Sequence, residues 1–117
     1  MDRPKPPAIQ DSAKVIAFAI VDESVTYTGR ISTYVDGNLI GPVPKLSICQ
    51  NPGEDDYLLF YCNEQWEVLA AGGGDSIEQV KNTAEKAYSG ISSRWQWFNY
   101  WFKPLASLTR DRLKPAP

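Results

Sequence analysis

The residues with the most evident chemical potential are the acidic run Glu54–Asp56 and the two cysteines, Cys49 and Cys62. Three neighbouring carboxylates could bind calcium, but an EF-hand loop places its acids at alternate positions and adds a distal glutamate. The cysteines lack CxxC spacing, and the chain has no histidine that could complete a zinc site. A disulfide would require the two side chains to meet across strands. We therefore predict a solvated loop at 54–56, two buried cysteines and no bound metal.

Two further patterns could belong to an active site. The run Gly72–Gly74 precedes a predicted helix, but the Lys-Ser or Lys-Thr of a P-loop and the third glycine of a dinucleotide motif are both missing. Glu64 and Glu67 flank a turn, whereas a hydrolytic carboxylate pair must face each other across a cleft. Without histidine, the chain has no His general base and no Ser-His-Asp or Cys-His arrangement. The sequence predicts a protein that is not an enzyme and binds no cofactor.

The charge distribution argues against nucleic acid as a partner. The net charge is −2 and the pI is near 5.0. Residues 54–85 hold eight acids and a single base, Lys81, whereas residues 103–117 hold four bases and one acid. The N-terminus contains no apolar signal-peptide core, and no run reaches the roughly 18–20 apolar residues that span a bilayer. We expect a cytoplasmic protein with no transmembrane segment and no nucleic-acid partner.

The elements that must position these residues belong to one domain. Residues 1–12 contain three prolines and are expected to form a flexible arm. The domain itself is expected over residues 13–109, followed by a basic flexible tail over residues 110–117.

Strand patterns dominate the first two thirds of the chain. The apolar run Val15–Val21 predicts a strand buried on both faces, with a buried helical turn as the alternative. Asp36-Gly37 predicts a tight hairpin turn, because both residues tolerate positive φ. After the last strand, Gly72–Gly74 is expected to release the chain from the sheet. The other predicted strands are Leu46–Gln50, Tyr57–Cys62 and Trp66–Ala71.

The clearest local element is a helix over residues 76–89. Asp75 or Ser76 caps the helix, and each has a suitable partner for a capping box three positions later, in Glu78 and Gln79. Gly90 suits the left-handed position after the helix. The pattern predicts an α+β fold with an antiparallel sheet of about four to five strands and this helix packed on one face. The residues expected to face the sheet are Ile77, Val80, Ala84, Ala87 and Tyr88.

Aromatic residues are concentrated near the C-terminus, with six of the fourteen in residues 95–102. Their spacing predicts a helical segment that Pro104 divides into two pieces, although residues 94–98 could instead form a short strand. The aromatic side chains could cover the sheet, form a protein interface or rest on a membrane surface. We expect Trp95 and Phe98 to pack against the sheet.

One stretch of about 40 residues is shared with a known group of proteins. It comprises the hairpin Tyr57–Leu69, the helix start Asp75–Glu78, and the helix end Ala84–Ile91 with Trp95. It resembles small uncharacterised bacterial α+β proteins, some of which accompany toxin systems as immunity-like proteins. The resemblance implies a bacterial α+β protein with an immunity-like role, and no catalytic residue is carried over.

Two functions follow from these observations. The first is non-enzymatic protein–protein binding, including homodimer formation, through an aromatic surface. Its candidate residues are Trp97, Trp101, Phe102 and Leu105. The second is a small-ligand-binding or enzymatic domain with an aromatic pocket between sheet and helix. Its candidate lining residues are Tyr61, Cys62, Trp66 and Tyr88.

Overall fold

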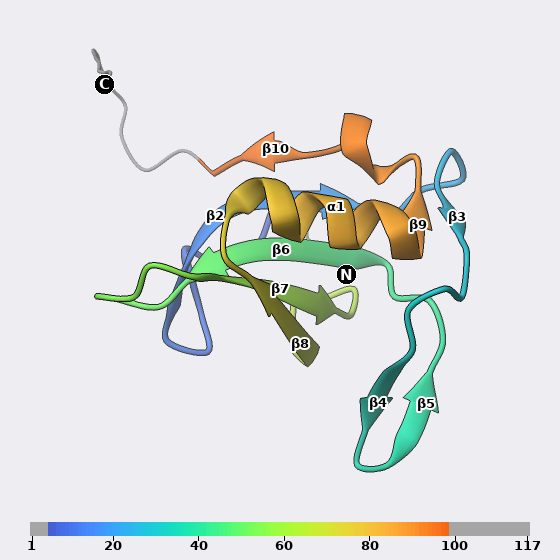
Figure 1. Ribbon diagram of the computed structural model, residues 1–117, viewed down its shortest axis with the longest axis horizontal. Coiled ribbons are helices and arrows are strands. Elements are labelled where there is room, and N and C mark those ends of the chain that lie inside the picture. Colours follow the sequence, from blue (N-terminus) through green and yellow to red (C-terminus); the bar gives the residue numbers. More distant parts are fainter. Residues whose placement is uncertain (1–4, 99–117) are drawn as a thin grey trace.

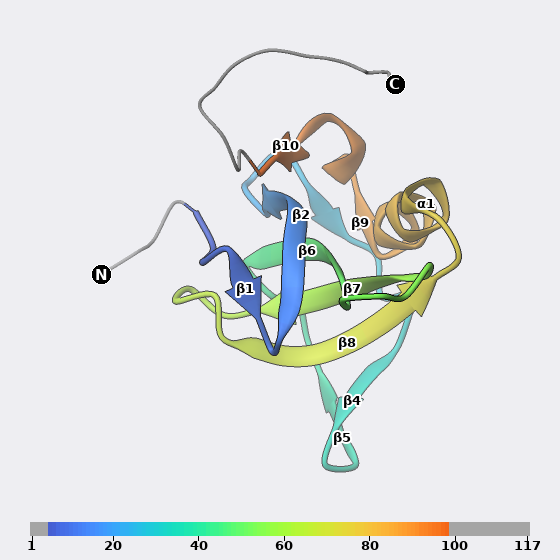
Figure 2. The same cartoon turned by 90° about the vertical axis from the view of Figure 1, so that its left-hand side faces the viewer.

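A curled antiparallel sheet with a helix against one face forms the body of the protein (Figures 1 and 2). The computed structural model describes residues 5–98. The helix is α1 (Ile77–Ala87), and the predicted α+β fold is confirmed. The strands follow the order β1 (Ile9–Gln10), β2 (Ala13–Ile20), β6 (Lys45–Gln50), β7 (Tyr57–Cys62) and β8 (Val68–Gly74).

Strand β2 is paired along both edges. Its inner edge pairs with β6, and its outer edge is shared by β1 and the short strand β10 (Gln96–Trp97). The N–H of Phe98 donates to the carbonyl of Ile16 at 2.8 Å and extends this pairing. The helical prediction was therefore wrong for residues 96–97, and the alternative of a short strand within residues 94–98 is confirmed there, because the open edge of β2 offers this segment inter-strand hydrogen bonds. The rest of the predicted C-terminal helix lies outside the described residues.

The expected N-terminal arm also contributes to the sheet. Residues 9–10 form β1 and join β2 through a two-residue turn, in which Asp11 and Ser12 both have positive φ. The side chain of Gln10 is 3% exposed and fixes this hairpin against the sheet. Strand structure therefore already occurs at residues 9–10, within the segment that we expected to form a flexible arm.

A β-bulge in β2 changes which residues of this strand face each side of the sheet. The register with β6 shifts between Val15 and Ala17, so these two side chains point to opposite faces although they are two residues apart. The prediction of a doubly buried strand is confirmed, and the alternative of a helical turn was wrong.

Each face of the sheet carries its own core. The helix-side cluster lies between the sheet and α1, and the Trp66 cluster lies on the opposite face. The buried members of the helix-side cluster are Ala17, Ala19, Val25, Val43, Leu46, Ile48, Leu59, Tyr61, Val80, Ala84, Ala87, Tyr88 and Ile91. Those of the Trp66 cluster are Ala13, Val15, Phe18, Cys49, Phe60, Cys62 and Trp66.

The helix begins as predicted and ends two residues early. The Ser76 hydroxyl accepts a hydrogen bond from the Gln79 N–H at 3.1 Å, which confirms the N-cap. Tyr88 and Ser89 instead form β9, which pairs with β3 (Thr26–Tyr27), because pairing with a distant strand replaces the last helical turn. Gly90 has a φ of 99° and leads into the 3₁₀ helix η1 (Ile91–Ser93).

The predicted hairpin is confirmed as a two-stranded ribbon of β4 (Thr33–Val35) and β5 (Asn38–Ile40). Its turn residues, Asp36 and Gly37, have φ values of 52° and 80°, as a type I′ turn requires. The ribbon projects below the sheet in both views, beside β8 (Figures 1 and 2).

The glycine run was wrongly predicted to be a linker, because Gly72–Gly74 completes β8 and pairs with β7. A side chain at the end of the run would crowd the helix, which approaches the sheet closely there. A Cβ atom on Gly74 would lie 3.0 Å from Gln79 Oε1 and 3.1 Å from Val80 Cγ2. A Cβ atom on Gly72 would meet nothing within 4 Å.

We predict that Gly74→Val lowers the free energy of unfolding by about 1–3 kcal/mol, because the added methyl groups overpack the contact with Val80. Gly72→Val is the matched control and should leave stability unchanged or slightly raised, since a β-branched residue suits an exposed strand position. Urea unfolding monitored by circular dichroism would measure both. Equal losses in the two variants would contradict this account of the helix–sheet contact.

Candidate functional site

An open groove of about 380 Å³ lies between the β4–β5 hairpin, the adjoining strand β8 and helix α1. The hairpin supplies one wall, and the exposed backbone of β8 supplies the other. Tyr61 of β7 lies at its inner side and is 5% exposed. The main lining residues are Ile31, Thr33, Tyr34, Tyr61, Ala70–Gly73 and Thr83.

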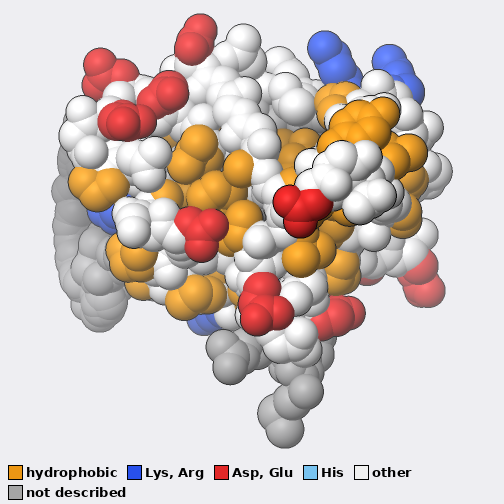
Figure 3. Space-filling view, turned by 90° about the horizontal axis from the view of Figure 1, so that it is seen from below, with side chains coloured by type: hydrophobic (Ala, Val, Ile, Leu, Met, Phe, Trp, Pro, Cys, Tyr) orange, Lys and Arg blue, Asp and Glu red, His pale blue; other side chains and the backbone are white. Residues whose placement is uncertain are grey.

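Large hydrophobic side chains are exposed on two of the elements that form this groove. Residues 5–98 expose five such side chains, and three of them lie on the hairpin and on β8. Tyr34 and Leu39, at 61% and 60% exposed, are directly paired across the hairpin, and Leu69 on β8 is 41% exposed. Figure 3, which views the molecule from this side, shows hydrophobic side chains gathered in several patches. We call the groove together with Tyr34, Leu39 and Leu69 the hairpin face.

The surroundings of the hairpin face are acidic. Glu67 precedes β8 and Asp75 follows it, and both side chains are exposed. The hairpin segment 31–41 adds Asp36 and no basic residue. The single base within residues 54–85, Lys81, has its ammonium group 4.8 Å from the centre of the Trp97 ring. Acidic side chains accordingly lie among the hydrophobic patches in Figure 3.

The described lining of the groove offers hydroxyl groups for hydrogen bonding. Burial raises the pKa of Tyr61, and a side-chain hydrogen bond with Thr33 opposes part of this shift. Tyr61 therefore remains a neutral phenol at physiological pH. The described lining contains no Asp, Glu, Lys or Cys, and residues 5–98 hold no cluster of three or more metal-ligating side chains.

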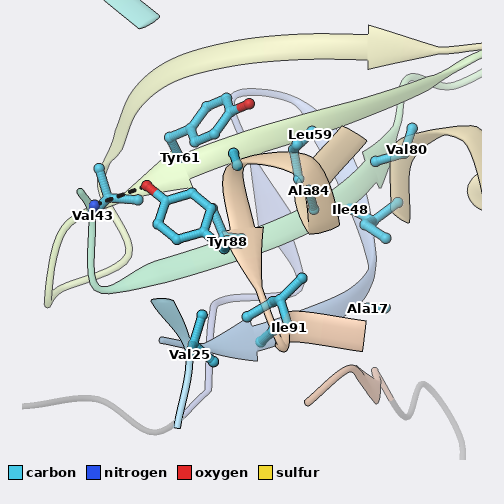
Figure 4. Close-up of a cluster of buried hydrophobic side chains, with 13 residues drawn as sticks. Ala17, Val25, Val43, Ile48, Leu59, Tyr61, Val80, Ala84, Tyr88 and Ile91 are labelled. Atoms are coloured by element: carbon cyan, nitrogen blue, oxygen red, sulfur yellow. Dashed lines mark hydrogen bonds between the residues drawn. The ribbon is translucent and has the colours of Figure 1, made fainter. Parts of the chain in front are cut away.

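The predicted aromatic pocket is divided between the two faces of the sheet. Tyr61 and Tyr88 both lie in the helix-side cluster, where the Tyr88 hydroxyl accepts a hydrogen bond from the Val43 N–H at 3.0 Å (Figure 4). Trp66 and Cys62 belong to the cluster on the opposite face. Of these four residues, only Tyr61 lines the groove.

Trp66 is buried and packed against neighbouring side chains. It is 2% exposed, and its ring meets that of Phe18 edge to face, with 5.7 Å between centroids. The buried Lys45 ammonium lies 5.1 Å from the Trp66 ring centre and donates a hydrogen bond to the Glu64 carbonyl at 2.8 Å. These contacts bury Trp66 in the core of this face, and they hold the turn between β7 and β8.

Of the four residues predicted to form an aromatic binding surface, the described part of the structure includes one. Trp97 is 62% exposed on β10, whereas Trp101, Phe102 and Leu105 lie outside the described residues. Trp95 packs against the helix-side cluster and Phe98 against the Trp66 cluster, so their predicted packing on the sheet is confirmed.

Sequence reasoning missed the hairpin face, although its signals were present. Tyr34 and Leu39 stand symmetrically about the Asp36-Gly37 turn, which pairs them across the hairpin. The strand Val68–Gly74 contains neither a charged residue nor a proline, the usual devices that protect an open sheet edge. The hairpin lies beside this strand only in the tertiary structure, and no local sequence pattern predicts that position.

The two cysteines lie in a buried polar cluster organised by Gln10. The Gln10 amide donates to the Trp66 carbonyl at 2.8 Å and to Cys62 Sγ at 3.6 Å, and it accepts from the Ser47 hydroxyl at 2.6 Å. Both cysteines are free and buried, as predicted. Burial raises the pKa of the Cys49 thiol to about 12 and also raises the pKa of Cys62.

We predict that neither thiol reacts appreciably with Ellman's reagent at pH 8 in the folded protein. A raised pKa keeps the thiol protonated, and only the thiolate attacks the reagent, so labelling should be at least about a hundredfold slower than in urea. Ser92→Cys, at an exposed position, is the positive control and should react rapidly. Rapid labelling of the unaltered folded protein would contradict the burial of this cluster.

None of the family models, curated proteins or solved structures compared with this chain matches it. No relative therefore supplies a residue role or a ligand that could be transferred to these positions. None of the helices in residues 5–98 is long and apolar enough to cross a membrane. The hairpin face is thus defined by its own geometry.

Proposed function

We propose that this protein acts without catalysis, by binding a protein partner through the hairpin face. The observation that carries the proposal is the exposure of Tyr34, Leu39 and Leu69 on the hairpin and on β8, two adjoining elements that form one groove lined in part by Tyr34. Grouped exposed hydrophobic side chains on a small domain mark interaction surfaces, and tyrosine is favoured among interface anchors. The acidic surroundings add electrostatic selectivity for a partner that carries positive charge.

A small ligand in the groove is the second candidate function. The groove volume of about 380 Å³ falls within the range of small-molecule sites, and hydroxyl groups of Thr33, Tyr61 and Thr83 belong to residues of its lining. A thermal-shift screen against metabolites would favour this candidate if one compound raised the melting temperature by several degrees.

Self-association is a separate proposal that concerns the opposite edge of the sheet. Trp97 is exposed there, and the neighbouring sequence supplies the further aromatic residues Trp101 and Phe102. We retain the homodimer as a proposal for this aromatic surface. We also propose a cytoplasmic location, which two free buried thiols support.

The binding proposal predicts that Tyr34→Asp combined with Leu39→Asp abolishes capture of the partner in the native host, because both anchors become charged. The bait carries p-benzoylphenylalanine in place of Leu69 for photocrosslinking, and mass spectrometry identifies the product. Ile9→Asp is the matched control, since Ile9 is 54% exposed but lies on the distant strand β1.

The expected result is one crosslinked partner with the unaltered bait and with Ile9→Asp, and at least a tenfold lower yield with the double variant. Melting temperatures of all baits verify that each is folded. Equal yields from the double variant and the control would refute the hairpin face as the binding surface.

A further inference from the structure

We infer that the partner docks as an extended peptide strand that pairs with the free edge of β8 and carries basic side chains. This inference rests on the proposed function, since it names the chemistry of the partner at the same face. The pairing would add one more antiparallel or parallel strand to the sheet beyond β8.

The first support is the unpaired edge itself. β8 is the last strand in the sheet order, and within residues 5–98 it pairs with β7 alone. In an antiparallel pair, alternate residues direct their N–H and C=O groups away from the neighbouring strand. From Ala70 to Gly74 the register with β7 is regular, so this edge presents an uninterrupted row of such groups.

The second support is access to that backbone. Ala71, Gly72 and Gly73 are exposed, and their small side chains leave the edge uncovered. Gly72 has nothing within 4 Å of the position where a Cβ atom would lie. An added strand would also direct alternate side chains into the groove beside Tyr34, which provides an apolar contact on one face.

The third support is charge. Glu67 and Asp75 bracket β8 at its two ends, and Asp36 caps the hairpin alongside. A peptide with Lys or Arg side chains would meet acids at both ends of the edge, whereas an acidic peptide would be repelled. The same charges disfavour a second copy of this chain. A two-fold pairing of β8 centred on Ala71 would set Glu67 opposite Asp75 of the second copy, and like charges directly opposite destabilise strand pairing.

The test uses the full chain and a capped ten-residue peptide of alternating valine and lysine. Fluorescence anisotropy measures binding, and amide hydrogen exchange locates it. We expect binding with a Kd on the order of 10 μM and slower exchange at residues 70–74. The same peptide with glutamate in place of lysine should bind at least tenfold more weakly. N-methylation of alternate residues along the pairing edge should abolish binding, because it removes the N–H donors.

A matched pair of protein variants assigns the effect to the β8 edge. Ala71→Lys places a charge of the peptide's own sign on the exposed edge and should weaken binding at least tenfold. Ile9→Lys makes the same change on β1 and should leave the affinity unchanged. Both positions are exposed, so melting temperatures should match that of the unaltered protein.

The outcomes separate this inference from the proposed function. Unchanged peptide binding by Ala71→Lys, or protection from exchange outside residues 70–74, would overturn strand addition. Retention of the Tyr34- and Leu39-dependent partner would then leave the proposed function standing. Protection of residues 70–74 without any peptide, lost when the four basic residues of 103–117 are replaced by glutamate, would overturn the inference in favour of this chain's own C-terminus.

Discussion

The double pairing of β2 is the constraint on which the rest of the structure depends. β6 occupies one of its edges, while β1 and β10 divide the other, so both ends of the described chain are fixed to one strand. The bulge between Val15 and Ala17 directs side chains of this strand into both cores. Disruption of β2 would therefore release the terminal strands and remove apolar contacts from both faces of the sheet at once.

Because β1 and β10 cover one edge of the sheet, the two edges of the sheet differ. One side of the sheet is closed by two short strands and by the buried Gln10 amide, whereas the other side ends at β8 without a further strand in residues 5–98. The chain places its projecting hairpin, with Tyr34 and Leu39 exposed, beside that open strand. An exposed edge is normally protected by charge, proline or a covering element. Its presence in a strand without charge or proline supports a role in recognition.

Several aromatic residues that suggested a ligand pocket stabilise the fold instead. Trp66 packs on Phe18 and lies beside the Lys45 ammonium, Phe98 meets Phe18 from β10, and Tyr88 pairs with Tyr27. Each buries a large apolar surface in a domain with two thin cores. Tyr34 and Leu39, by contrast, are exposed.

The sequence by itself determined the elements whose causes are local. The Asp36-Gly37 turn follows from tolerance of positive φ, and the helix start follows from the hydroxyl of Ser76 bonding to the Gln79 N–H. The tertiary structure decided everything that depends on a distant strand. Residues 9–10 and 96–97 became strands because β2 had an open edge, and Gly72–Gly74 stayed in the sheet because β7 paired with it. The separation of Tyr61 from Trp66, and the groove beside β8, likewise depend on strand pairing between residues far apart in the chain, for which the sequence has no local signal.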